Sequence, residues 1–478
     1  MEVVLSAAAS DLISRIISFL LKRYIENTAI DEKLQRLQQL LLRIHAVVEE
    51  ADGRYITNPR MLVQLKVLVA HMYKGYHMLD MLRYKSDLES TTHEDSTMSS
   101  IHLKRSRTFN LGTIKSFAES NDLQSILESM ENAIANMTEF VVLLGGCERQ
   151  CRRPYDTYLY IDKFLFGRHV EKQQIINTLL QNHGHHGTPV VLPIIGGIRV
   201  GKKALVSHVC ENDRIRSYFS SILFVDGDSI CRMDQEMFSN ERILIVVEFI
   251  TDVDDDDWVK FYSTVRCMAA EGSKVIIISR IQNLARFGTV KAVFLNGLSH
   301  EEYRYLFKVL AFGSTDEKDN PHLASVANEL AIVLRGSLIT ANVVADLLRR
   351  NHDFQFWLRI LRRFKGMVDS NVSMYGEHPK HMLENEQAID ITTFNPSCRS
   401  SLRLMPPQVE REDSPKQKLA HVSFGDLISG CVSIPADQFV LVAWESRIPP
   451  YTRLVANVTF AAEKHECSTS TRKRRCSI

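Results

Sequence analysis

The sequence predicts a multidomain protein of the α plus α/β class, in which an N-terminal helical bundle precedes a central parallel β-sheet with a phosphate-binding loop. Three observations predict this fold class. Apolar residues recur at intervals of three and four through residues 1–85, as they do in amphipathic helices. Short apolar runs alternate with helical patterns between residues 190 and 280, which is typical of a parallel sheet covered by helices. Beyond residue 367, polar and proline-bearing segments precede three strand-like runs, so we expect a mixed or β-like C-terminal region.

Composition narrows the functional class. The 478 residues carry a net charge of +1, which gives no indication of nucleic-acid or membrane binding. The nine cysteines are odd in number and lack paired CxxC spacing, which favours free thiols in a reducing compartment over a zinc site. Glu2, Asp11 and Arg15 interrupt the apolar N-terminus, so we expect neither a signal peptide nor a transmembrane segment. A cytoplasmic location is therefore predicted, with nuclear import through the basic tail (Arg472 to Arg475) as the alternative.

Three apolar stripes organise the predicted N-terminal helical domain, residues 1–85. The stripes are Ile13, Ile16, Ile17, Leu20 and Tyr24; Leu34, Leu37, Leu41, Ile44 and Val48; and Leu62, Leu65, Val69, Met72, Tyr76 and Leu79. Each stripe must be buried against another helix, so a small bundle is predicted. A two-stranded coiled coil is the alternative, because the same spacing suits a heptad repeat.

Residues 86–160 are predicted to form a linker with one helix. The segment from Ser86 to Thr113 is rich in serine and threonine and contains a basic cluster (Lys104, Arg105 and Arg107), which is typical of a solvated linker. The helix is expected to begin after a cap at Asn121 or Asp122 and to end at Gly145-Gly146.

The phosphate-binding loop is predicted from the stretch Thr188 to Cys210. An apolar run from Val190 to Ile195 leads into Gly196-x-x-x-x-Gly201-Lys202, and an amphipathic helix follows. Glycines let backbone N–H groups converge on phosphate oxygens, and the lysine reaches the terminal phosphates. Lys203 stands where a serine or threonine would supply a hydroxyl ligand to Mg²⁺, and an ammonium group cannot ligate a divalent cation. The alternative is a strand–loop–helix turn that binds no nucleotide.

Further strands bring charged residues to the same place. Apolar runs at Ile222–Val225, Arg242–Val247 and Ser273–Ser279 indicate parallel strands, whose carboxyl ends form the ligand-binding edge of such sheets. Lys202, Glu248 and Arg280 should therefore converge at one edge. Glu248 is the candidate Mg²⁺ ligand, and Phe249 replaces the second acid that many such strands carry. The candidate phosphate-binding residues are Gly196, Gly197, Arg199, Gly201, Lys202, Lys203 and Arg280.

The order of these motifs resembles the NB-ARC domain of the coiled-coil nucleotide-binding leucine-rich-repeat family of plant disease-resistance proteins. The resemblance rests on Phe166-Gly167-Arg168, GGIRVGKKAL, RILIVVEF, GSKVIIISR and LNGLSHEEYRYLFKVLAFG, and it covers about three quarters of the chain, to Arg363. It implies an Rx-type four-helix N-terminal domain, a P-loop NTPase-like nucleotide-binding subdomain (residues 161–295) and a helical subdomain (residues 296–366). Residues 367–478 are left without a predicted fold beyond their strand-like runs at Ala420–Phe424, Gln438–Trp444 and Leu454–Phe460.

The sequence also departs from the family pattern. Besides Lys203 and Glu248-Phe249, the Gly-Leu-Pro-Leu-Ala segment reads Gly336 to Thr340 without its proline, and Asp80 alone remains of the acidic motif in the third N-terminal helix. No leucine-rich repeats follow. Mg²⁺ coordination is therefore expected to be damaged at two positions, and ATP hydrolysis to be negligible.

Two functions are compatible with this pattern. The resemblance implies a defence signalling switch that binds ADP or ATP and pairs with other receptors or signalling proteins through its N-terminal helices. The alternative is an adaptor or decoy that pairs with full-length receptors and binds no nucleotide. An active P-loop NTPase is disfavoured by Lys203 and Phe249.

Overall fold

The computed structural model describes residues 31–94, 112–150, 165–181, 188–232, 241–394, 401–410, 419–430, 438–446 and 452–461. The chain divides into two compact units, Met1–Leu306 and Phe307–Ile478. The predicted first helical stripe, the basic cluster at residues 104–107 and the basic tail lie outside the described residues.

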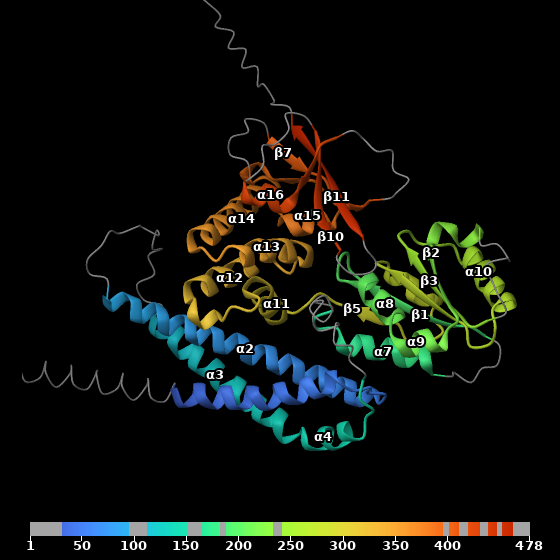
Figure 1. Cartoon of the computed structure of the whole chain (residues 1–478), viewed down its shortest axis with the longest axis horizontal. Coiled ribbons are helices and arrows are strands. Elements are labelled where there is room, and N and C mark those ends of the chain that lie inside the picture. Colours follow the sequence, from blue (N-terminus) through green and yellow to red (C-terminus); the bar gives the residue numbers. More distant parts are fainter. Residues whose placement is uncertain are drawn as a thin grey trace, which may run out of the picture. The chain divides into compact units, whose positions relative to one another are not determined.

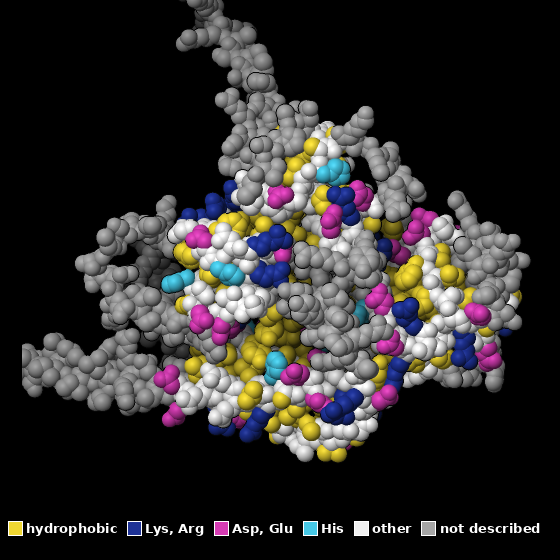
Figure 2. All heavy atoms as spheres, viewed as in Figure 1, with side chains coloured by type: hydrophobic (Ala, Val, Ile, Leu, Met, Phe, Trp, Pro, Cys, Tyr) yellow, Lys and Arg dark blue, Asp and Glu magenta, His cyan; other side chains and the backbone are white. Residues whose placement is uncertain are grey.

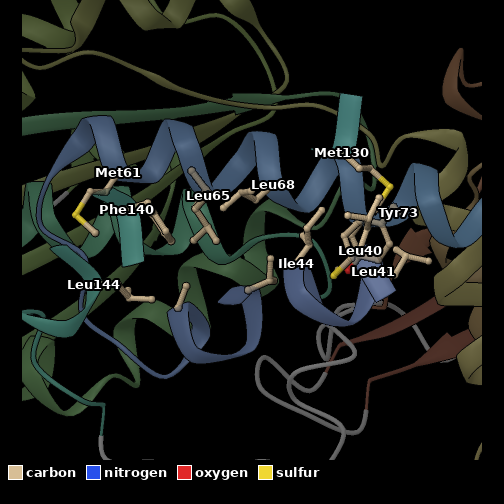
Figure 3. Close-up of a cluster of buried hydrophobic side chains, with 14 of the residues drawn as sticks. Leu40, Leu41, Ile44, Met61, Leu65, Leu68, Tyr73, Met130, Phe140 and Leu144 are labelled. Carbon is tan, nitrogen blue, oxygen red and sulfur yellow. The ribbon is translucent and has the colours of Figure 1, made fainter. Parts of the chain in front are cut away.

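The described N-terminal helices share one hydrophobic core. Residues 31–52 form a helix that packs with α2 (Pro59–Glu94), α3 (Gly112–Ala135) and α4 (Thr138–Gly145). Figure 3 shows side chains from all four helices in this cluster, among them Leu41, Leu65, Met130 and Phe140. Gly75 permits the close packing, since a Cβ atom there would lie 2.8 Å from Cδ2 of Leu41. The second and third predicted stripes are thus buried in a bundle.

The region between this bundle and the sheet differs from its prediction in two ways. Helix α2 continues through residues 86–94, because serine and threonine lower helix propensity by only a few tenths of a kcal/mol each and no glycine or proline intervenes. Two helices, α3 and α4, replace the single predicted helix, and α3 begins at Gly112 and not after the predicted cap at Asn121 or Asp122. They are separated at Asn136 and Met137, where the N–H of Met137 bonds to the carbonyl of Ile134 at 3.1 Å and tightens the turn.

The central sheet has five parallel strands in the order β2-β3-β4-β1-β5 (Figure 1). The strands are β1 (Val190–Gly196), β2 (Ser221–Asp226), β3 (Ile243–Phe249), β4 (Lys274–Ser279) and β5 (Val293–Leu295). Strands β1, β3 and β4 occupy the middle of the sheet and are buried along almost their whole length, as their unbroken apolar runs predict.

Helices cover both faces of this sheet. Alternate residues, such as Ile194 and Val246, pack against α7 (His169–Leu180), α8 (Lys202–Cys210) and α9 (Asp213–Tyr218). Their neighbours Ile195 and Val247 pack on the other side against Trp258 and α10 (Asp255–Met268), with the 3₁₀ turns η1 (Gly227–Arg232) and η3 (Gln282–Phe287). Because all five strands are parallel, their carboxyl ends lie at one edge of the sheet.

The second unit combines helices with a mixed sheet. After α11 (His300–Phe312), within which the two units meet in sequence, its helices are η4 (Glu317–Asp319), α12 (Pro321–Leu334), α13 (Leu338–Arg350), α14 (Phe354–Tyr375), α15 (Pro379–Glu384), η5 (Thr392–Phe394) and α16 (Phe424–Ser429). Its strands are β6 (Ile389–Asp390), β7 (Ser401–Leu404), β8 (Gln408–Val409), β9 (His421–Ser423), β10 (Phe439–Glu445) and β11 (Arg453–Ala461).

The sheet of the second unit runs β6-β7-β11-β10-β9, with β8 also paired to β11. The β9–β10 pair is parallel and the other pairs are antiparallel. The three strand-like runs therefore correspond to β9, β10 and β11, and the expected mixed C-terminal region is confirmed. Helix α14 continues past residue 366, where the sequence placed the end of the helical subdomain.

In the described part of the chain, none of the helices combines the length and apolar composition that crossing a bilayer requires. Figure 2 shows Lys and Arg side chains interspersed with Asp and Glu over the described atoms of the face in view.

Candidate phosphate-binding site

The loop between β1 and α8 has the backbone that a phosphate cradle requires. Gly201 adopts φ +92°, and a Cβ atom there would meet open space. Gly196 is needed for a different reason, since its Cβ would lie 2.4 Å from the carbonyl oxygen of Leu295 on β5. Arg199 also takes a left-handed conformation, with φ 57°, which is strained for a residue that carries a side chain.

The Lys202 side chain folds back over this loop. Its Nζ donates hydrogen bonds to the carbonyl oxygens of Gly196, at 2.8 Å, and Gly197, at 2.6 Å. Burial lowers the pKa of Lys202 to about 8; Glu248 acts to raise it, and Arg280 and Lys203 act to lower it. The ammonium group is therefore incompletely solvated and lies within electrostatic range of three charged residues.

Lys202, Glu248 and Arg280 meet at one edge of the sheet, as predicted. Glu248 is the penultimate residue of β3 and pairs in register with Ile278. Arg280 follows directly after β4 and is exposed. The remaining candidates (Gly196, Gly197, Arg199, Gly201 and Lys203) lie at the end of β1, in the loop or in the first turn of α8.

The residues at this edge do not fit Mg²⁺. Lys203 Nζ forms an ion pair with Oε2 of Glu248, so an ammonium group already occupies the carboxylate that was predicted to hold the metal. Phe249 points into the core, where its ring meets that of Trp258 at 6.3 Å. Within the described ranges, no group of three or more His, Cys, Asp and Glu side chains is placed to hold a metal ion.

The same residues do fit the phosphates of a nucleotide. Among the described residues, no side chain caps the N-terminus of α8, so its first-turn N–H groups face the loop without a side-chain acceptor. The helix dipole and the cationic side chains of Lys202, Lys203 and Arg280 favour an anion there. The arrangement can bind and orient phosphate oxygens.

Arg168 anchors the loop, a role that the sequence did not reveal. Its side chain is only 8% exposed, and Nη2 donates to the carbonyl oxygens of Val200, at 3.2 Å, and Asn296, at 2.6 Å. Burial lowers the pKa of the Arg168 guanidinium, and Glu171 and Glu302 oppose this shift. One buried cation thus ties the phosphate loop to the segment after β5. The motif Phe166-Gly167-Arg168 was the signal, but its spacing says nothing of these partners.

The neighbours of Arg168 hold its backbone in place. Gly167 has φ +71°, and a Cβ atom there would lie 2.9 Å from Cδ2 of Leu298. The Phe166 ring packs against those of Tyr73, at 5.2 Å, and Tyr305, at 6.0 Å. The motif therefore connects the N-terminal helices to the loop between β1 and α8 within the first unit.

A cavity of about 810 Å³ lies beside this motif, lined by residues of the N-terminal helices, α7, α8 and the segment 296–305. Arg168 and His208 contribute to its wall, and the phosphate loop residues do not. Burial lowers the pKa of His208 to about 3, and the nearby Lys172 and His169 act in the same direction. The cavity is thus separate from the cradle, although Arg168 borders both.

Comparison with known proteins places these features in a family context. Residues 8–110 match the family model described as the Rx N-terminal domain. The chain is 24% identical over 375 residues to disease resistance protein RGA2 of Solanum bulbocastanum. This alignment covers 72% of the chain and 37% of RGA2. It is 22% identical over 395 residues to the putative disease resistance RPP13-like protein 1 of Arabidopsis thaliana. This second alignment covers 75% of the chain and 37% of the relative.

The chain thus spans little more than a third of the length of these relatives. Among solved structures, domain III of the Thermotoga maritima replication initiation protein DnaA aligns with 49% of the chain and 97% of its own length, at 14% identity and a TM-score of 0.24.

Proposed function

Because this chain belongs to the nucleotide-binding leucine-rich-repeat family of plant disease-resistance proteins, we propose that it is a defence signalling switch that binds ADP or ATP through its phosphate loop and hydrolyses ATP negligibly. In such a switch, ADP and ATP favour different conformations because each makes different contacts with them.

The Lys202 ammonium is the observation that carries the proposal. It is held inside the loop by two carbonyl oxygens, is partly stripped of water, and has Lys203 and Arg280 as further cations nearby. A nucleotide phosphate would give this group an anionic acceptor in place of neutral carbonyls, and charge-assisted hydrogen bonds are about twice as strong as neutral ones. Backbone N–H groups of the first turn of α8 would orient the same phosphate.

The residues at the end of β3 support the proposal that ATP hydrolysis is negligible. Hydrolysis by this class of loop relies on Mg²⁺ to neutralise developing charge and on a positioned group to orient water. Here Glu248 is paired with Lys203, and Phe249 is buried in the core. The chain therefore lacks free carboxylates at both positions where such strands supply them.

Calorimetric titration with ADP tests the proposal. We expect wild-type protein to bind ADP and the Lys202→Ala variant to bind about 10- to 100-fold more weakly, since a hydrogen bond to a charged group contributes about 1.5–3 kcal/mol. Lys260→Ala is the matched control, because Lys260 is an exposed lysine on α10 whose ammonium pairs with Asp257 at 3.3 Å, and this variant should bind ADP as wild type does. An absence of heat in wild-type protein would overturn the proposal.

The adaptor function is the second candidate, and the N-terminal helices favour it. Leu42 is 73% exposed and Val63 is 61% exposed, so apolar side chains remain on the outer faces of these helices. In an adaptor, the hydrogen bonds from Lys202 to the loop carbonyls would persist, because no nucleotide phosphate would replace them. Lys202→Ala would then leave association with a receptor partner unchanged. A pull-down of the wild-type protein and of Lys202→Ala with that partner distinguishes the adaptor from the switch.

A further inference from the structure

We propose that the Lys203–Glu248 ion pair takes the place of the magnesium ion, so that this loop binds the terminal phosphates of ADP or ATP without a divalent cation. The inference rests on the proposed function and specifies how the same site neutralises phosphate charge.

The position of Lys203 is the first argument. In the loop motif, the residue after the lysine supplies the metal-binding hydroxyl, and the acid at the end of the neighbouring strand completes the metal site. Lys203 is that residue in this chain, and Glu248 is that acid. Their ion pair spans the gap between α8 and the end of β3. The Lys203 side chain therefore replaces the hydroxyl ligand, and its ammonium contacts the acid that would otherwise hold the metal ion.

The charge at the edge is the second argument. Lys202 lies within electrostatic range of Lys203, Arg280 and Glu248, so cationic side chains gather around the loop lysine. A bound phosphate would interact favourably with these cations without a metal ion. A divalent cation at Glu248 would have to displace the ammonium or lie against it, and like charges at such a separation repel strongly.

Exposure shows that the pair is available to a ligand. The Lys203 side chain is 44% exposed and that of Glu248 is 27% exposed, so neither is sealed in the core. An ordinary surface ion pair would contribute little to stability and nothing to binding. Replacing Lys203 should therefore weaken nucleotide binding if the ion pair takes the place of the metal ion, and should leave the affinity unchanged if the pair is an ordinary surface contact.

The test measures ADP affinity by calorimetry in EDTA and in excess MgCl₂. For wild-type protein we expect dissociation constants that agree within about twofold, since no metal takes part. Lys203→Thr restores the hydroxyl and frees Glu248, so its affinity in EDTA should fall by at least about tenfold and recover in MgCl₂. Mn²⁺ paramagnetic resonance gives a second readout: the ion should be immobilised by Lys203→Thr with ADP and not by wild type with ADP.

The outcomes separate this inference from the proposed function. If wild-type protein binds ADP at least about tenfold more tightly in MgCl₂ than in EDTA, the substitution of a metal by Lys203 is refuted and nucleotide binding stands. If folded wild-type protein binds ADP in neither condition, the proposed function fails and the inference fails with it. If Lys203→Met binds ADP as tightly as wild type in EDTA, the ion pair is an ordinary surface contact. The wild-type comparison requires no variant, so it is decisive even if a substitution prevents folding.

Discussion

Replacing Arg168 by methionine should destabilise the first unit more than any exposed arginine substitution does. The side chain is buried, and its Nη2 donates to the carbonyl oxygens of Val200 and Asn296, which are far apart in sequence. Methionine fills a similar volume with a flexible apolar chain but cannot donate a hydrogen bond. Both carbonyl groups would lose their charged donor.

The size of the effect follows from these two bonds. Each hydrogen bond to a charged group contributes about 1.5–3 kcal/mol, and removing the guanidinium also removes the unfavourable burial that lowers its pKa. We therefore expect a net loss of about 3 kcal/mol. In a domain of this size each kcal/mol lowers the unfolding midpoint by about 2–4 °C, so the midpoint should fall by about 6–12 °C.

Thermal unfolding followed by circular dichroism measures this change. Arg266→Met is the matched control, because Arg266 is exposed in the last turn of α10, and its midpoint should stay within about 2 °C of wild type. Arg168→Lys should lie between the two, since an ammonium group keeps a charged donor but lacks the fixed planar arrangement of the guanidinium N–H groups. Equal midpoints for Arg168→Met and Arg266→Met would refute the anchoring role of Arg168.

Two further predictions concern other parts of the chain. Burial lowers the pKa of His208 to about 3, below its value of about 6.5 in the unfolded chain. The stability that the neutral His208 imidazole contributes is therefore fully present above about pH 6.5 and is lost as the pH falls toward 3. In urea unfolding, His208 should contribute up to about 1.4 kcal/mol per pH unit to the slope in this window, and His208→Gln should lower the slope by that amount; an unchanged slope would contradict the assignment. Asn371, fully buried in α14, donates to the carbonyl oxygen of Asp390 at 2.7 Å and accepts from its N–H at 2.8 Å. Asn371→Leu should therefore lower the free energy of unfolding by about 2–5 kcal/mol, whereas the exposed Asn385→Leu should change it by less than about 0.5 kcal/mol; similar losses would show that these bonds contribute little.

The architecture of the sheet could be predicted because it depends on patterns that the sequence carries directly. Continuous apolar runs such as Ile243 to Val247 are needed only where a strand is buried on both faces, and helices between them require parallel connections. Parallel strands end at the same edge, so the meeting of Lys202, Glu248 and Arg280 followed from topology alone.

Side-chain contacts between distant segments could not be predicted in the same way. The absence of a hydroxyl at Lys203 was visible, but the ion pair with Glu248 depends on the distance between α8 and β3 and on the direction of a long flexible side chain. The partners of Arg168 are backbone carbonyls, which have no sequence signature. The site was therefore predicted as a set of positions, and its electrostatics became apparent only in three dimensions.

Helix ends were the weakest part of the prediction, because small differences in propensity decide them. The polar residues 86–94 were expected to be a linker and instead extend α2, and the predicted single helix is divided at Asn136. In the C-terminal unit the strand-like runs were placed correctly, whereas the pairing of β9 parallel to β10 depends on connections that local patterns do not specify.

The most direct test of this account is a crystal structure of the chain with ADP, grown in EDTA. The account predicts that the terminal phosphate lies on the N-terminus of α8, that Lys202 Nζ has left the carbonyl oxygens of Gly196 and Gly197 to contact it, and that Lys203 remains beside Glu248. A loop still closed by Lys202, with ADP absent or bound elsewhere on the chain, would contradict it.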